Sequence, residues 1–135
     1  MIVLDCSAAV AIVRQTEEGQ ALNSFITAGD KIISSTLLQI ELASAFGKYV
    51  KAGLLDKVTA VEYIQNACAF VDEFMPIKES CIEALHESLR LGHSVYDLLY
   101  FVLARRSSAT LFTLDKELMK LCAEQGIDCI HEVNI

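Results

Sequence analysis

The sequence predicts an α/β fold, a three-layer α/β/α sandwich around a short parallel sheet of four or five strands. Short, β-branched apolar runs alternate along the chain with longer stretches in which apolar residues have helical spacing. Strands that alternate with helices are joined by right-handed crossovers, which place parallel strands in one sheet with helices on both faces. At 135 residues the chain has the usual length of one domain, so we expect a single domain over residues 1–135.

The N-terminal half predicts two strands and four helices. The apolar run 2–4 is the first strand, and Ser7 is the expected cap of the helix that follows. Gly29 and Gly53 stand where helix ends are expected. The remaining elements are a first helix over 8–14, a helix over 18–27, a strand over 31–34, a helix over 36–51 and a helix from Asp56 or Thr59 to about residue 72.

The C-terminal half predicts three strands and three helices. Pro76, the only proline, favours an edge strand because proline cannot donate to a sheet ladder. Gly92 and Gly126 close two helices, and Ser94 caps a third. The elements are a strand over 74–77, a helix over 79–91, a helix from 94 to about 106, a strand over 109–113, a helix over 115–125 and a strand over 127–130.

Composition excludes several classes of protein. The net charge of −7 and a pI near 4.8 argue against a basic nucleic-acid binder, but an acidic pocket still meets phosphate through a divalent cation. Hydrophobic residues make up 53%, yet no apolar run reaches the roughly 18–20 residues of a membrane span. The start Met1–Asp5 is not a secretory signal, so we expect an intracellular, cytoplasmic protein.

Cysteines and histidines give no metal pattern. The five cysteines are odd in number and form no C-x-x-C pair, which favours reduced core thiols. His93 lies four residues before Asp97, but a helix break at 92–94 is expected between them. We therefore interpret His86, His93 and His131 as surface or hydrogen-bonded side chains. No glycine-rich phosphate loop is present.

Two acidic residues stand at the ends of expected strands. Asp5 ends the strand 2–4, and Asp115 follows the strand 109–113. The carboxyl ends of parallel strands meet at one edge of the sheet, where ligand sites form in α/β folds. We therefore expect both carboxylates at a functional edge.

Two further acids interrupt apolar helix faces. Glu41 shares a helical stripe with Leu37, Leu38 and Ala45, and Asp97 shares one with Phe101 and Ala104. A carboxylate on such a stripe is costly to desolvate without a partner. We therefore expect these two acids to join the strand-end acids rather than to face the core unpaired.

Converging carboxylates need a positive partner, because like charges raise one another's pKa. A divalent cation supplies it, since hard cations prefer oxygen ligands. A water made more acidic by the cation would attack a phosphodiester in line, and the departing 3′-oxygen would be stabilised by metal. Each acid also has a local alternative: Asp115 as a helix cap, Asp97 in the first turn after Ser94, Asp5 in a strand–helix turn and Glu41 in solvent.

Four segments together resemble a known family. They are residues 1–8 (Met-Ile-Val-Leu-Asp-Cys-Ser-Ala), Glu41 within 38–45, Tyr-Asp-Leu-Leu-Tyr at 96–100 with Ala104, and 111–118 (Leu-Phe-Thr-Leu-Asp-Lys-Glu-Leu). Their order and spacing resemble the PIN domain, and in particular the VapC-type toxins of prokaryotic toxin–antitoxin pairs. The resemblance covers essentially the whole chain.

The resemblance implies an α/β/α sandwich and a Mg²⁺- or Mn²⁺-dependent endoribonuclease. Ser7 and Thr113 match hydroxyls that support the acids, and Cys6 stands where VapC-type proteins more often have Thr. We expect the Cys6 side chain to point away from the site. The positions that match the family's catalytic and metal-binding acids are Asp5, Glu41, Asp97 and Asp115.

The resemblance also implies partners: an RNA substrate, a second copy of the chain in a homodimer, and a cognate antitoxin whose basic side chain blocks the metal site. An acidic chain suits a basic partner, because opposite charges speed association. Candidate RNA phosphate contacts, each equally well a solvated basic side chain, are Arg14, Lys48, Lys51 and Lys116.

Two other functions stay open. Asp5 could accept a phosphoryl group in a receiver-like or phosphatase-like domain. Such domains have a lysine after a late strand or a second aspartate two residues after the first. Here Ser7 stands in place of that aspartate, and Lys116 directly follows Asp115. Alternatively, the chain could be a non-catalytic interaction module that acts through the apolar helices at 37–50 and 58–71.

Overall fold

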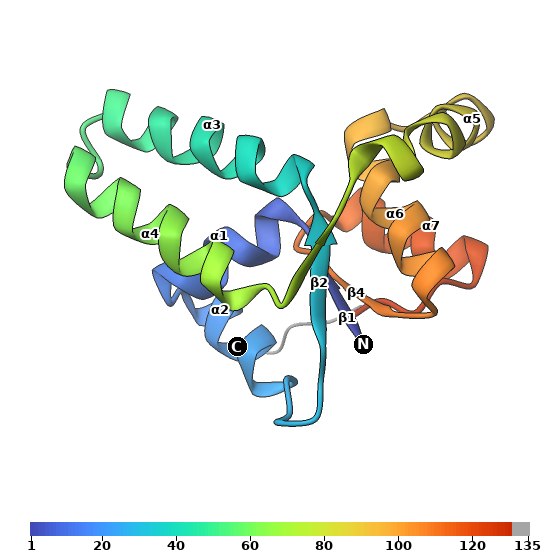
Figure 1. The fold of residues 1–135 in the computed structure, drawn as a ribbon, viewed down its shortest axis with the longest axis horizontal. Helices are drawn as coiled ribbons and strands as arrows, with labels where there is room; N and C mark the ends of the chain where they lie inside the picture. The colour runs from blue at the N-terminus through green and yellow to red at the C-terminus, as the bar shows by residue number, and fades with distance from the viewer. Residues whose placement is uncertain (131–135) are drawn as a thin grey trace.

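A four-stranded parallel sheet forms the middle layer of the protein (Figure 1). The computed structural model describes residues 1–130. The strand order is β3-β2-β1-β4, so β1 and β2 are central, and Ile2 of β1 pairs with Ile32 on one side and Thr110 on the other. The strands are β1 (Ile2–Leu4), β2 (Ile32–Ser35), β3 (Glu73–Met75) and β4 (Thr110–Phe112). The predicted fold class is confirmed.

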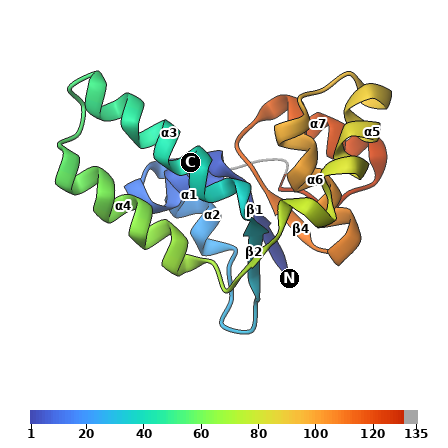
Figure 2. The same ribbon diagram turned by 45° about the horizontal axis from the view of Figure 1, so that its top comes forward.

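Helices cover both faces of this sheet. Figure 2 shows α3 and α4 as a hairpin on one side, together with α1 and α2, and α5, α6 and α7 grouped on the other. On one side the helices are α1 (Cys6–Arg14), α2 (Glu17–Ser24), α3 (Leu37–Lys51) and α4 (Lys57–Phe70). On the other they are α5 (Cys81–Leu91), α6 (Val95–Ser107) and α7 (Lys116–Gln125), with the short 3₁₀ turn η1 (Ile77–Glu79) before α5.

The strands divide their side chains between two apolar cores. Val3, Ile33 and Leu111 pack with α6 and α7, because alternate residues of a strand face opposite sides of the sheet. Leu4 and Phe112 pack on the other side with α1, α3 and α4. Both faces of the central strand β1 are therefore covered, and Val3 and Leu4 have no exposed surface. Whatever follows β1 starts inside the protein.

Three local predictions were wrong. Helix α1 is capped by the side chain of Asp5, which accepts from the Ala8 amide, and not by Ser7. The strand predicted over 127–130 is only an isolated bridge between Cys129 and Leu111. The helix predicted from Glu79 begins at Cys81, because η1 precedes it. Among the described residues, no helix has both the length and the apolar character needed to cross a membrane.

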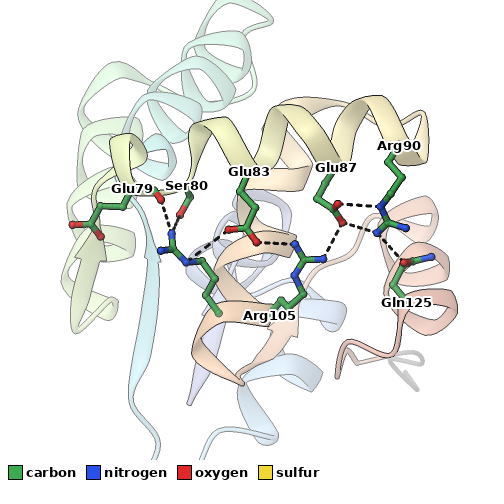
Figure 3. A network of polar contacts seen from close by, with 8 residues as sticks. Glu79, Ser80, Glu83, Glu87, Arg90, Arg105 and Gln125 are labelled. Atoms are coloured by element: carbon green, nitrogen blue, oxygen red, sulfur yellow. Dashed lines mark hydrogen bonds and ion pairs between the residues drawn. The ribbon is translucent and has the colours of Figure 1, made fainter.

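Helix α5 packs on α6 through charged side chains. Figure 3 shows Glu87 between Arg90 and Arg105, whose nitrogens lie 2.6 Å and 2.9 Å from its Oε2. Arg105 also reaches Glu83 at 2.7 Å, and Arg106 donates to the Glu79 carbonyl. The hydrogen bonds from Arg90 and Arg105 hold the pKa of Glu87 at about 2. This network joins α5 to α6 by ion pairs, while Ala84 of α5 is buried in the core and Ile82, Leu85 and Leu89 are exposed.

Candidate metal centre

Asp5 is the buried end of the candidate site. It follows β1 directly and is 4% exposed. Its Oδ1 accepts from the Ser7 hydroxyl at 2.7 Å and from the Ala8 amide at 2.9 Å, and its Oδ2 accepts from Thr113. Burial raises the pKa of Asp5 to about 6, although all three hydrogen bonds favour the ionised form.

Ser7 and Thr113 connect Asp5 to the end of β4. The Ser7 hydroxyl accepts from the Leu114 amide at 2.9 Å, and the Thr113 hydroxyl accepts from the Asp115 amide at 3.0 Å. The family resemblance implies that these two hydroxyls support the acids. They lie between the end of β1 and the end of β4. They fix Asp5 against the segment that carries Asp115.

Asp115 caps α7 and lies at the surface end of the site. Its Oδ1 accepts from the amides of Glu117 at 2.9 Å and Leu118 at 3.3 Å, so the local alternative predicted for it is correct. The same cap leaves Asp115 close to two side chains of other segments. Among residues 1–130, the ligand atoms of His93, Asp97 and Asp115 lie within 4.8 Å of one another.

Asp97 is in the first turn of α6, after the cap formed by Ser94. His93 Nε2 lies 3.1 Å from Asp97 Oδ2. Burial chiefly raises the pKa of Asp97, and the nearby charge of Asp115 adds to it, whereas His93 lowers it. Asp97 is thus half-buried beside one acid and one imidazole.

Glu41 lies on α3, across the site from α6. Its Oε1 accepts a hydrogen bond of 2.5 Å from the hydroxyl of Tyr100, which is almost wholly buried. Burial raises the pKa of Glu41, the bond from Tyr100 lowers it, and the charge of Asp97 raises it again. The neighbour that compensates this acid is therefore a phenol, which composition and spacing did not indicate.

The four predicted acids share one electrostatic environment but not one tight cluster. The charge of Asp97 raises the pKa of both Asp5 and Glu41, and Asp115 raises that of Asp97. Asp5 and Glu41 nevertheless lie outside the group formed by His93, Asp97 and Asp115. The predicted ligand set is thus split into a close pair of acids and two flanking acids.

His93 is the site residue that the sequence interpretation missed. It follows Gly92, whose positive φ of 66° ends α5, and the helix break expected at 92–94 wrongly predicted that His93 and Asp97 lie apart. The i, i+4 spacing was the correct signal, because Ser94 starts α6 at once and keeps His93 at its base. The histidine is partly buried, with 14% of its side chain exposed.

The donor set fits a divalent cation. Within residues 1–130, the only ion pair made by any of the four acids is the one between Asp97 and His93, and no lysine or arginine neutralises them. Carboxylate oxygens are the ligands that Mg²⁺ and Mn²⁺ prefer. Carboxylates that no lysine or arginine neutralises therefore suit a cation placed among them.

The reason given for expecting the Cys6 side chain to point away from the site does not hold, because Cys6 is in helix α1. That expectation relied on strand alternation, but Cys6 is the first residue of a helix. Its side chain packs with the α1–α4 core, while burial and the charges of Glu41 and Asp5 raise the pKa of its thiol to about 12. Cys6 is thus a neutral neighbour of the acids.

Comparisons with known proteins identify the family of this chain. The family model described as PIN domain matches residues 2–124. Ribonuclease VapC3 of Pyrobaculum aerophilum is 27% identical over 122 residues, which are 87% of this chain and 91% of that protein.

Two solved structures share the fold. The crystal structure of PAE2754 from Pyrobaculum aerophilum has a TM-score of 0.70 at 22% identity and covers 88% of this chain and 84% of its own. VapBC-1 from nontypeable Haemophilus influenzae has a TM-score of 0.67 at 15% identity, covering 96% and 97%. The resemblance seen in the sequence is confirmed, and this chain belongs to the PIN domain family.

Proposed function

We propose that this chain is a metal-dependent endoribonuclease that cleaves RNA phosphodiesters and serves as the toxin of a VapBC-type toxin–antitoxin pair. The relative named Ribonuclease VapC3 supports the activity, and the resemblance to VapBC-1 supports the fold. The observation that carries the proposal is the close approach of Asp97 and Asp115, which no lysine or arginine of residues 1–130 neutralises, near buried Asp5.

Asp97 and Asp115 are the residues best placed to hold Mg²⁺ or Mn²⁺, because their oxygens already lie close together. Asp5 would join them directly or through water, from a position fixed by Ser7 and Thr113. When bound, the cation supplies a more acidic water and positive charge at the scissile phosphate.

Glu41 has a separate role in this proposal. Its Oε1 is engaged by Tyr100, which leaves Oε2 to bind the cation or to orient the attacking water and take its proton. The raised pKa of Glu41 suits proton transfer near neutral pH, because a general base works best when its pKa lies near the operating pH.

The candidate RNA contacts differ in their surroundings. Arg14 donates to the Tyr49 hydroxyl at 3.0 Å and stacks 4.5 Å from its ring centre, so it is held between α1 and α3. Lys48 and Lys51 are in the last turn of α3, and ten residues of helix put Lys51 about 15 Å beyond Glu41. Lys116 is exposed and adjoins Asp115, which makes it the best placed to meet RNA phosphate.

The proposed partners are a cognate antitoxin and a second copy of the chain. The net charge of −7 suits a basic antitoxin segment. On α5, Ile82, Leu85 and Leu89 are 65%, 46% and 77% exposed, and an apolar stripe of this kind favours a homodimer. Replacing Leu89 with Lys should shift the chain from dimer to monomer in sedimentation velocity. A monomeric wild-type chain would contradict the homodimer.

The rival functions receive less support. Asp5 is 4% exposed and both of its carboxylate oxygens already accept hydrogen bonds, so the carboxylate is poorly accessible to the phosphoryl donor that it would have to attack in line. An interaction module without activity has no need for a histidine and two acids around one point, although such a group alone does not exclude it.

The test is RNA cleavage by the purified chain with Mg²⁺ or Mn²⁺, and with a chelator as the metal-free reference. Asp5→Asn should abolish metal-dependent cleavage, a loss of about a hundredfold or more. The matched control is Asp56→Asn, because Asp56 also caps a helix but is exposed at α4. Full activity of Asp5→Asn would remove Asp5 from the site, and an inactive wild-type chain would favour the interaction module.

A further inference from the structure

His93 places a nitrogen donor in a centre that the sequence predicts to be made of carboxylates alone. Its Nε2 is 3.1 Å from Asp97 Oδ2, and its side chain is 14% exposed, against 30% for that of Asp97. The imidazole therefore faces into the acidic group rather than out to solvent.

The backbone on both sides of His93 is held in place. The left-handed conformation of Gly92 turns the chain sharply at the end of α5. The carbonyl of His93 then accepts a hydrogen bond of 2.5 Å from the Ser88 hydroxyl. Ser94 caps α6 directly afterwards. Because both neighbours are constrained, the imidazole is presented to the site with little freedom of its backbone.

The geometry suits a shared cation. Three atoms within 4.8 Å of one another lie no more than about 2.8 Å (4.8 Å divided by √3) from some common point, whereas metal–ligand bonds are about 2.0–2.2 Å. Side-chain movements of less than about 1 Å would thus bring one imidazole nitrogen and one oxygen each of Asp97 and Asp115 to bonding distance, and Nε2 is the nitrogen that already faces Asp97. A cation held there would replace the hydrogen bond between His93 Nε2 and Asp97 Oδ2.

We propose that His93 is a direct metal ligand through Nε2, and that this mixed nitrogen–oxygen donor set makes the centre favour a transition-metal ion over Mg²⁺. The inference rests on the proposed metal-dependent function and specifies its ion. Imidazole is a borderline donor that binds later first-row transition ions well, while Mg²⁺ prefers oxygen and retains its waters. An all-carboxylate centre would have a weaker preference of this kind.

A merely structural role for His93 makes different predictions. If the imidazole only orients Asp97, its removal would weaken the binding of all divalent ions alike, because Asp97 would serve each of them less well. If the imidazole is a ligand, its removal lowers the affinity mainly for ions that prefer nitrogen donors. The ratio of two affinities therefore separates the roles.

The experiment measures Co²⁺ and Mg²⁺ binding to the full chain by titration calorimetry, for wild type, His93→Gln and His86→Gln. His86 is the matched control, because it is an exposed histidine on α5 outside the acidic group. His93→Gln should lower Co²⁺ affinity about tenfold or more and change Mg²⁺ affinity less than about threefold. His86→Gln should change neither.

A second measurement needs no variant. In the Co²⁺-loaded wild-type chain, the ring protons of His93 should show the large paramagnetic NMR shifts of a coordinated imidazole, and those of His86 should not. Equal losses for both ions, or an unshifted His93 ring, would overturn the proposal while leaving the metal centre intact. Absence of any divalent-ion binding to the wild-type chain would instead overturn the proposed function itself, and this inference with it.

Discussion

Asp5 and Asp115 have the same local role but different environments. Each follows a parallel strand, each caps the next helix with its side chain, and a hydroxyl stands two residues away in both segments. Yet Asp5 is 4% exposed, with a pKa raised to about 6 by burial, whereas Asp115 is only partly buried.

The position of each strand in the sheet explains the difference. β1 is central, with β2 and β4 on its two sides and helices over both faces, so the residue at its end is enclosed. β4 is flanked by β1 on one side and, on the other, by a single bridge at Cys129. The same sequence pattern thus gives a buried acid, whose ionised form is disfavoured by desolvation, at the centre of the sheet. At the edge of the sheet it gives a more accessible acid.

The largest effect that would sharpen this comparison is a pH-dependent stability cost of Asp5. Its pKa is about 6 in the folded chain, against 3.8 as the ordinary value, so the folded state binds this proton more tightly. The associated stability is fully present below about pH 3.8 and is lost as pH rises through 6. Without metal, Asp5→Asn should therefore be about 3 kcal/mol more stable than wild type at pH 7.5 and nearly equal to it at pH 4.

Urea denaturation in chelator at a series of pH values measures this difference. Taking the variant against wild type cancels the other titrating groups, such as Glu87, whose lowered pKa acts in the opposite direction. Asp115→Asn is the paired control and should differ from wild type by less than about 0.5 kcal/mol throughout, because Asn is an equally good helix cap. If the difference in unfolding free energy between Asp5→Asn and wild type did not change with pH, burial would not destabilise the ionised form of Asp5.

A smaller effect is expected from Thr113, the residue that links the two acids. Thr113→Val removes the hydroxyl that donates to Asp5 and accepts from the Asp115 amide, while keeping the shape of the side chain. The unfolding free energy should fall by about 1–2 kcal/mol. The pKa of Asp5 should rise further above 6, because this hydrogen bond favours its ionised form.

Denaturant unfolding and an NMR titration of the Asp5 carboxyl carbon test both parts. Thr110→Val is the matched control on the same strand, since the Thr110 hydroxyl has no hydrogen bond among residues 1–130. If both variants lose equal stability and leave the Asp5 titration unchanged, Thr113 does not connect the two acids.

The grouping of Asp97 and Asp115 was predictable because acids in such positions violate local rules. Acids at strand ends and on apolar helix faces are conspicuous, and the structure brings Asp97 and Asp115 together as expected. His93 violated no rule, since a histidine beside a helix break is ordinary. The sequence analysis gave Tyr100 no role, because only the packing of α3 near α6 brings its hydroxyl to Glu41.

The cap of α1 was the one helix cap predicted at the wrong residue. Ser7 is a good helix cap by residue type, but Asp5 takes that role because its carboxylate needs donors after it is buried at the end of β1. Ser7 is then free to bridge Asp5 and Leu114. Which of two suitable residues caps a helix therefore depends on how deeply each is buried. That burial follows from the order of the strands in the sheet, which is a property of the tertiary structure.

By itself the sequence determined the alternation of strands and helices, the parallel sheet and the identity of the acids, because periodicity and residue type act over short distances. Only the tertiary structure decided that β1 is central, that Asp5 is enclosed while Asp115 is accessible, and that His93 rather than Asp5 completes the close group with Asp97. Those outcomes depend on which distant segments pack together, and burial and charge proximity exist only once they have.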